Sequence, residues 1–263
     1  MTDWVIYITA ALTGLLIGSF LNVVIYRGPV LWKLIDAPSR GNFALPRSYC
    51  PHCEKSIRAV HLVPLIGYIM LRGKCTDCHG VIPIRYPLIE LFGALAAVGA
   101  ILLFGLSPAA IMSAIFFWFL IALAAIDLET GYLPDALTLP LIVIGLGANW
   151  FDLFVTAKDA AIGAVAGYAI FRLIGIAFIR LRDVEGLGQG DAKLLAVIGA
   201  WLGWTALAPV VFLGAVIALI CVAIGAARGT NVAKDTPIPF GPALAVAAMA
   251  MMVARGLNLP LLY

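Results

Sequence analysis

The sequence predicts an all-α polytopic membrane protein, with about eight transmembrane helices and a small cytoplasmic zinc-binding insert after the first helix. Composition is the first observation behind this class: 63% of the 263 residues are hydrophobic and 12% are charged, with a mean hydropathy of +1.06. Soluble domains are roughly 45–50% apolar and about 25% charged. The other two observations are the length of the apolar stretches and four cysteines gathered between the first two of them.

The apolar residues form stretches long enough for helices that cross a bilayer, which needs about 20 residues each. Such long runs exclude a barrel, whose strands are about 10 residues long and alternate in polarity. Asp3 stands where a signal peptide would carry basic residues, so we expect the first stretch to be a true span. The expected spans are 4–26, 87–104, 108–126, 133–149, 159–179, 190–204, 206–226 and 237–254.

Positive charge predicts which ends of these spans face the cytoplasm. The segment 27–86 has nine basic and three acidic residues, so we place it in the cytoplasm and the N-terminus on the periplasmic side. Alternating the spans from there puts 14 of the 17 basic residues on the cytoplasmic side. The connections 127–135 and 180–191 then share that face. The net charge of only +3 gives no support for a nucleic-acid partner.

Four of the five cysteines form two CxxC pairs separated by 21 residues: Cys50, Cys53, Cys75 and Cys78. This spacing is typical of a tetrahedral zinc site with four thiolate ligands. Two disulfides are the alternative, which a cytoplasmic location disfavours. A site closed by four thiolates has no open coordination position, so zinc here is expected to stabilise a fold and not to do chemistry.

Asp127 ends the third span, where a carboxylate meets the negative end of the helix dipole. That position is unfavourable for stability and therefore suggests a function, although a solvated carboxylate just beyond the membrane edge is the alternative. Glu90, near the start of the second span, either pairs with a cation at the interface or lines a site. Asp135 is expected to cap the fourth helix.

Asp191 follows three glycines, Gly186, Gly188 and Gly190, and precedes an apolar run. A plain N-cap is one interpretation. The glycines favour another, because they permit φ > 0 and close backbone approach, which a cap does not require. Two carboxylates held close in a site of low dielectric share one proton, and such a pair can hydrolyse a peptide bond. Asp127 and Asp191 are the candidates for that pair.

Several stretches together resemble the bacterial type IV prepilin peptidases over essentially the whole chain. They are GSFLNVVIYR (18–27), PRSYCPHC (46–53), LRGKCTDC (71–78), RYPLIEL (85–91), AIDLETGYLPDALTLPL (125–141), GLGQGDAKLLAVIGAWLGW (186–204) and PIPFGP (237–242).

The resemblance implies a bifunctional enzyme of the inner membrane, an aspartic protease of the GxGD type. Its catalytic pair falls on Asp127 and Asp191, with Gly188 and Gly190 in the supporting loop. The implied substrates are prepilins or pseudopilins, cut after a glycine at the cytoplasmic face. The new N-terminus is then methylated from S-adenosylmethionine.

The division that follows is a transmembrane helix at 1–26, a cytoplasmic zinc-binding domain associated with N-methylation at 27–86, and a membrane-embedded peptidase domain at 87–263. Glu90 is the candidate methyltransferase residue. S-adenosylmethionine rests on the resemblance alone, because the chain has no glycine-rich nucleotide fingerprint. A nonenzymatic, zinc-stapled membrane scaffold of a pilus or secretion system is the alternative. A proton-coupled transporter is disfavoured, since both aspartates lie at span ends.

Overall fold

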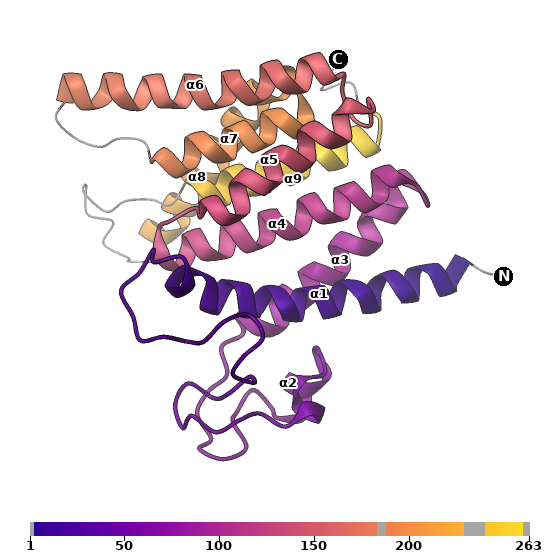
Figure 1. Cartoon of the computed structure of the whole chain (residues 1–263), viewed down its shortest axis with the longest axis vertical. Coiled ribbons are helices and arrows are strands. Elements are labelled where there is room, and N and C mark those ends of the chain that lie inside the picture. Colours follow the sequence, from indigo (N-terminus) through magenta and orange to yellow (C-terminus); the bar gives the residue numbers. More distant parts are fainter. Residues whose placement is uncertain (1–2, 183–187, 229–239, 260–263) are drawn as a thin grey trace. The chain divides into compact units, whose positions relative to one another are not determined.

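The computed structural model describes residues 3–182, 188–228 and 240–259, which fold into a set of long helices with one irregular insert (Figure 1). Three sequence expectations fall outside these residues: the placement of Gly186, the cytoplasmic placement of Lys234, and the beginning of the eighth apolar stretch at 237–239.

Each of the eight apolar stretches coincides with a helix. The long helices are α1 (Asp3–Leu31), α3 (Arg85–Phe104), α4 (Pro108–Thr130), α5 (Asp135–Trp150), α6 (Ala157–Arg182), α7 (Gln189–Leu202), α8 (Leu207–Ala227) and α9 (Gly241–Gly256). Two 3₁₀ turns, Ala59–Leu62 and Trp204–Ala206, and the short helix α2 (Ile66–Met70) complete the described helices.

Five of the helices in the described part of the chain are long and apolar enough to cross a membrane. The spans are Trp4–Leu31, Arg85–Phe104, Pro108–Thr130, Ala157–Leu181 and Trp204–Ala227. Helices α5 and α9 have 16 residues each and α7 has 14, below the roughly 20 residues that a full crossing needs. The chain is thus a multi-pass membrane protein, and the predicted number of eight crossings is not confirmed.

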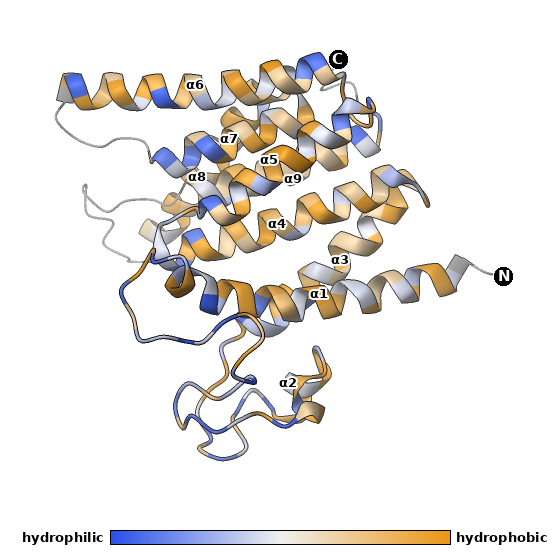
Figure 2. Ribbon diagram, viewed as in Figure 1, coloured by the Kyte–Doolittle hydropathy of each residue, from blue (hydrophilic) through white to orange (hydrophobic). Residues whose placement is uncertain are grey.

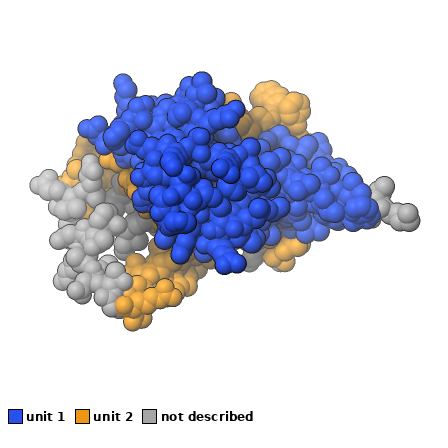
Figure 3. Space-filling view, turned by 90° about the horizontal axis from the view of Figure 1, so that it is seen from below, with its two compact units in different colours: residues 1–122 blue, residues 123–263 orange. Residues whose placement is uncertain are grey.

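The chain divides into two compact units, residues 1–122 and 123–263 (Figure 3). The boundary lies inside α4. The predicted domain boundaries, after residues 26 and 86, separate segments by membrane location and proposed function, whereas these units are defined by their internal contacts. Those domain boundaries stay a prediction.

In the first unit, α1 and α3 pack through glycines. A Cβ at Gly14 would lie 2.4 Å from the Gly93 carbonyl oxygen, and one at Gly18 would lie 2.7 Å from the Cα of Glu90. Gly14 and Gly18 have the spacing of small residues that lets membrane helices approach closely. The Asn22 side chain bridges the same pair, donating to the carbonyl of Tyr86 on α3 at 3.1 Å. These contacts fix the register of α1 on α3.

In the second unit, α7 is the most buried helix and packs against α5, α6 and α9. A Cβ at Gly199 of α7 would lie 2.0 Å from the carbonyl oxygen of Gly163 on α6, so glycine is required at this crossing. Asn149, fully buried at the end of α5, donates to the carbonyl of Ala200 at 2.8 Å. The helix that begins with the GQGD sequence is therefore held on several sides.

Figure 2 shows that the long helices are mainly hydrophobic, whereas much of the hydrophilic colour lies in the insert between α1 and α3. Many large apolar side chains on these helices are exposed, among them Leu16, Leu95 and Val165. Exposed apolar side chains in such number suit a lipid-facing surface.

Candidate functional site

Asp127 lies in the last turn of α4, where its side chain is buried, with 6% of the residue exposed. Its Oδ2 is buried with no hydrogen-bond partner among the described residues. A Cβ on Gly241, at the start of α9, would lie 2.5 Å from that oxygen. The backbone of α9 therefore approaches the carboxylate closely, which only glycine permits.

Asp191 is the third residue of α7, and Gly188 is the N-cap residue. The interpretation of Asp191 as a plain N-cap is therefore wrong in position. Its carboxylate lies beside the Gly188 backbone instead, since a Cβ on Gly188 would lie 3.4 Å from Oδ2 of Asp191. Asp191 therefore places its carboxylate at the start of α7.

Of the two glycines before Asp191 that the structure describes, neither has a positive φ, and Gly190 is required for its small size. Gly188 has φ of −65°, and Gly190 is not among the described residues with positive φ, so that part of the expectation is wrong. A Cβ on Gly190, however, would lie 3.0 Å from the Cβ of Leu133. Close approach is therefore the reason for glycine at 190.

These contacts bring the two aspartates into one site, within the second unit. Leu133 packs against both Gly190 and Gly241, and Gly241 lies against Asp127. The negative charge of Asp127 acts on Asp191. Asp191 lies outside the five candidate spans, and burial, together with that charge, raises its pKa to about 7. A carboxyl group in this state keeps a proton near neutrality, which general acid catalysis needs.

An ion pair joins two helix starts beside this site. Lys193, two residues after Asp191, pairs with Asp135 in the first turn of α5. Asp135 was expected to cap α5, but Pro134 occupies the N-cap position. The sequence did not reveal this pair, nor the roles of Leu133 and Gly241. The only sequence signal at Lys193 is its position two residues after Asp191, which by itself predicts no partner.

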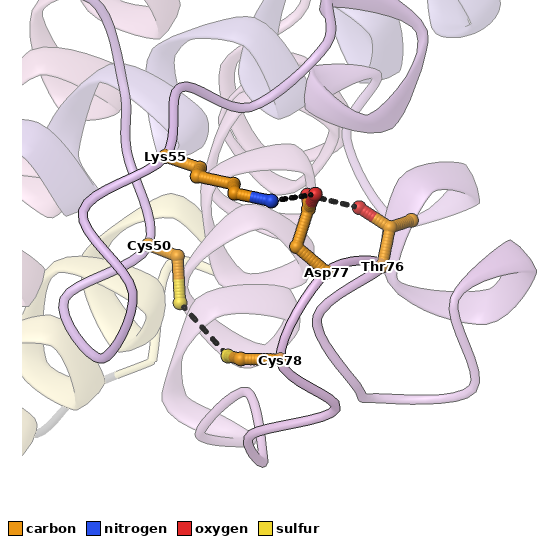
Figure 4. Close-up of polar contacts among 5 residues, drawn as sticks. All are labelled: Cys50, Lys55, Thr76, Asp77 and Cys78. Carbon is orange, nitrogen blue, oxygen red and sulfur yellow. Dashed lines mark hydrogen bonds and ion pairs between the residues drawn. The ribbon is translucent and has the colours of Figure 1, made fainter.

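The four cysteines of the insert converge as predicted. Their Sγ atoms all lie within 4.8 Å of one another, and those of Cys50 and Cys78 are 3.8 Å apart (Figure 4). A tetrahedron with Zn–S bonds of about 2.3 Å has sulfurs about 3.8 Å apart, so the donor set fits zinc. All five cysteines are free, and the distance far exceeds a disulfide bond of about 2.05 Å. The cluster is a candidate zinc site.

The two CxxC turns have matching backbones. The N–H of Cys50 donates to the carbonyl of Lys55 at 3.0 Å, and the N–H of Cys75 donates to the carbonyl of Gly80 at 2.9 Å. Lys55 of the first turn pairs with Asp77 of the second at 2.9 Å, which holds the pKa of Asp77 below its usual value (Figure 4). Four thiolates and one cross-link between turns make a compact metal-binding unit.

Glu90 is buried on α3 in the first unit, where it joins three segments. Its Oε2 accepts the backbone N–H of Leu65 at 2.8 Å, and its carboxylate also interacts with Ser19 of α1. Leu65 has φ of 59°, a conformation that costs a non-glycine residue energy. Glu90 therefore holds a strained turn of the insert, and a role in methyl transfer stays a prediction.

Comparison with known proteins covers both halves of the chain. Residues 12–104 match the model of the bacterial peptidase A24 N-terminal domain, and residues 114–223 match the type IV leader peptidase family. No solved structure gives a significant match.

Several similar curated proteins are named prepilin leader peptidase/N-methyltransferase. One from Burkholderia pseudomallei (strain 1026b) is 44% identical over 92% of this chain and 84% of its own length. One from Neisseria gonorrhoeae is 42% identical, covering 94% of this chain and 90% of the relative. One from Aeromonas hydrophila is 41% identical, covering 93% and 89%.

Proposed function

This chain belongs to the type IV leader peptidase family, and we propose that it cleaves the leader of prepilins or pseudopilins and then N-methylates the new N-terminus. The observation that supports the cleavage half is that Asp127, at the end of α4, and Asp191, at the start of α7, lie in one site beside the start of α9. The methylation half comes from the names of relatives that match over most of the chain.

The pair works as an aspartic protease dyad that holds one proton. The ionised carboxylate takes a proton from a water molecule as its oxygen attacks the scissile carbonyl carbon. The protonated carboxyl group gives its proton to the carbonyl oxygen. Collapse of the tetrahedral intermediate breaks the C–N bond, and a proton from the pair passes to the leaving amine. The shared proton belongs to the dyad and not to either residue.

Gly188 and Gly190 support the dyad by leaving room at the start of α7. A substrate bond must lie in extended form beside both carboxylates, and side chains at these positions would compete for that space. At Gly190 the space is already limited by Leu133, at 3.0 Å from a Cβ. Small residues here let the helix start, the loop before α5 and the substrate backbone come together.

The proposed location is the bacterial inner membrane, with the N-terminus in the periplasm. The aspartates and the zinc unit then face the cytoplasm. The distribution of basic residues supports this orientation. A basic leader that remains in the cytoplasm would meet the dyad on that side.

The methyl group comes from S-adenosylmethionine. In this step the lone pair of the new N-terminal amine bonds to the methyl carbon, and the S–CH₃ bond breaks with its electrons going to sulfur. The products are the methylated amine, S-adenosylhomocysteine and a proton released to solvent. Zinc bound by Cys50, Cys53, Cys75 and Cys78 holds the insert and takes no part in the bond changes.

The test uses purified protein in lipid nanodiscs with a prepilin peptide, scoring leader removal and methyl incorporation separately. We expect Asp127→Asn and Asp191→Asn to lose cleavage, while both still methylate a pre-cleaved peptide. Glu129→Gln, an exposed acid two residues from Asp127, is the matched control and should behave as the wild type. Cleavage that survives in either aspartate variant would show that this carboxylate is structural and not catalytic. No cleavage by the wild type itself would instead favour the nonenzymatic scaffold.

A further inference from the structure

A cavity of about 350 Å³ lies in the insert, between the segment that follows α1 and the first CxxC turn. This size is within the range of about 300–1,000 Å³ typical of small-molecule sites. Its lining carries charge of both signs, three hydroxyl groups and one aromatic ring. The polar lining residues are Ser39, Arg40, Arg47, Tyr49, Glu54 and Ser56, and we call this cavity the arginine pocket.

One wall of the arginine pocket is fixed by a buried arginine of α1. Arg27, with only 4% of its surface exposed, donates to the carbonyls of Asn42 at 2.6 Å and Pro46 at 2.8 Å. Its guanidinium therefore holds both sides of the loop that contributes Gly41 and Pro46 to the lining. Arg40 is anchored separately, by donating to the carbonyl of Tyr26 at 2.6 Å and lying 4.2 Å above its ring.

The other wall is the first zinc-binding turn. Tyr49 directly precedes Cys50 and Glu54 directly follows Cys53, so ligation of these cysteines would set both side chains. The bridge between Tyr49 and Ser56 closes the turn. Glu54 has φ of 58°, a conformation kept by the hydrogen bond from its N–H to the Cys50 carbonyl at 2.8 Å. Metal binding thus organises half of the pocket.

The pocket offers partners for a zwitterion with a second positive centre. The side chains of Arg47 and Glu54 form no hydrogen bond or ion pair with any residue that the structure describes, so both are free for a ligand. Arginine pairs with a carboxylate, glutamate with an ammonium or sugar hydroxyl, and the face of a tyrosine ring attracts a cation. A free phosphate or an anionic lipid headgroup would be matched by the arginines but has no positive group to pair with Glu54.

We propose that the arginine pocket binds S-adenosylmethionine, with Arg47 and Glu54 recognising its amino-acid end. This inference rests on the proposed methyltransferase function. It also gives the zinc unit a role in the binding of the methyl donor, since the turn of Cys50 and Cys53 carries one wall of the pocket. The residues are set by local contacts inside the first unit alone.

The test measures binding directly, with full-length zinc-loaded protein in nanodiscs and radiolabelled S-adenosylmethionine in equilibrium dialysis. We expect Arg47→Gln and Glu54→Gln each to weaken binding by about 10-fold or more, the scale of one lost charge-assisted hydrogen bond. Arg58→Gln, an exposed arginine of the same insert outside the pocket, is the matched control and should bind as the wild type. Zinc content and leader cleavage are measured on each variant and should be unchanged.

Two results would overturn the proposal and separate it from the proposed function. If the wild type methylates and both pocket variants bind S-adenosylmethionine normally, the site is elsewhere and only the pocket assignment fails. If the wild type neither binds S-adenosylmethionine nor methylates a pre-cleaved peptide, the methyltransferase function fails as well. Loss of a co-purified anionic lipid in Arg47→Gln, with binding of S-adenosylmethionine unchanged, would assign the pocket to a lipid headgroup.

Discussion

Asp191 combines a structural and a chemical role at one position. Its carboxylate lies in the first turn of α7, beside the Gly188 backbone, yet it is largely withdrawn from water and lies in the field of Asp127. The helix dipole normally favours the ionised form of a carboxylate in the first turn of a helix. Here burial and the neighbouring carboxylate outweigh the effect of the dipole, so the pKa of Asp191 rises.

The raised pKa of Asp191 predicts opposite pH dependences for the two activities. Below about pH 7 the dyad keeps its proton, and as the pH rises through that value both carboxylates become ionised, so cleavage should fall. Methyl transfer needs a neutral amine, whose pKa is about 7.7–8.0, and should rise over the same range. Both rates should be measured on one preparation from about pH 5 to 9. Cleavage that increases in parallel with methylation would contradict the assigned proton.

Residue types were visible in the sequence, but their neighbours were not. Asp127 and the GQGD glycines could be singled out because a carboxylate at a membrane edge is costly. Leu133 and Gly241 could not, since their importance comes from contacts between segments that are far apart in the sequence. The sequence also suggested positive φ for the glycines near Asp191, whereas the structure requires their small size at Gly190.

At the scale of elements, helix positions were predictable and membrane crossings were not. Long apolar runs gave all eight long helices, because helix formation in lipid follows from length and hydrophobicity. Helix α1 continues to Leu31, past the expected end at residue 26, and includes Pro29. The short helix α7 was counted as a span, but its apolar character reflects burial among α5, α6 and α9. A buried helix and a lipid-facing helix can have similar composition.

The ion pair between Lys193 and Asp135 predicts that the starts of α7 and α5 are held in a fixed position relative to each other. The pair is partly exposed, with side-chain exposures of 25% and 56%, so it should add little to stability, about 0–1 kcal/mol. It lies beside Asp191, however, and should set the position of α7 relative to the loop after Asp127. We expect Lys193→Gln and Asp135→Asn each to lower kcat several-fold with KM nearly unchanged, and the double variant to be no worse than either.

The exposed pair Lys55–Asp77 in the insert is the matched control for this experiment. Neutralising it in the same way should leave cleavage unchanged. If the effects of Lys193→Gln and Asp135→Asn instead multiply in the double variant, the two side chains act independently, and the pair does not position the dyad.

At the scale of the whole molecule, the sites of the two proposed activities lie in different units, which differ in how much hydrophobic core they have. The candidate zinc cluster and the arginine pocket lie in residues 1–122, and the aspartate site lies in residues 123–263. The second unit has a core of buried helix residues, including every residue of α7 from Leu194 to Leu202. The insert has no comparable core: in the segment 30–88, which the structure describes in full, Cys50 is the only buried hydrophobic side chain.

Removing zinc should therefore separate the activities. Without a hydrophobic core, the insert depends on its four thiolates for its fold, and a metal-dependent fold unfolds when the metal is chelated. We expect a strong chelator to abolish methylation of a pre-cleaved peptide and binding of S-adenosylmethionine, while leader cleavage by the dyad persists. Adding zinc back, but not magnesium, should restore methylation, since magnesium prefers oxygen ligands. Cleavage that declines in step with zinc release would show that the dyad depends on the insert, and the division of labour between the two units would be wrong.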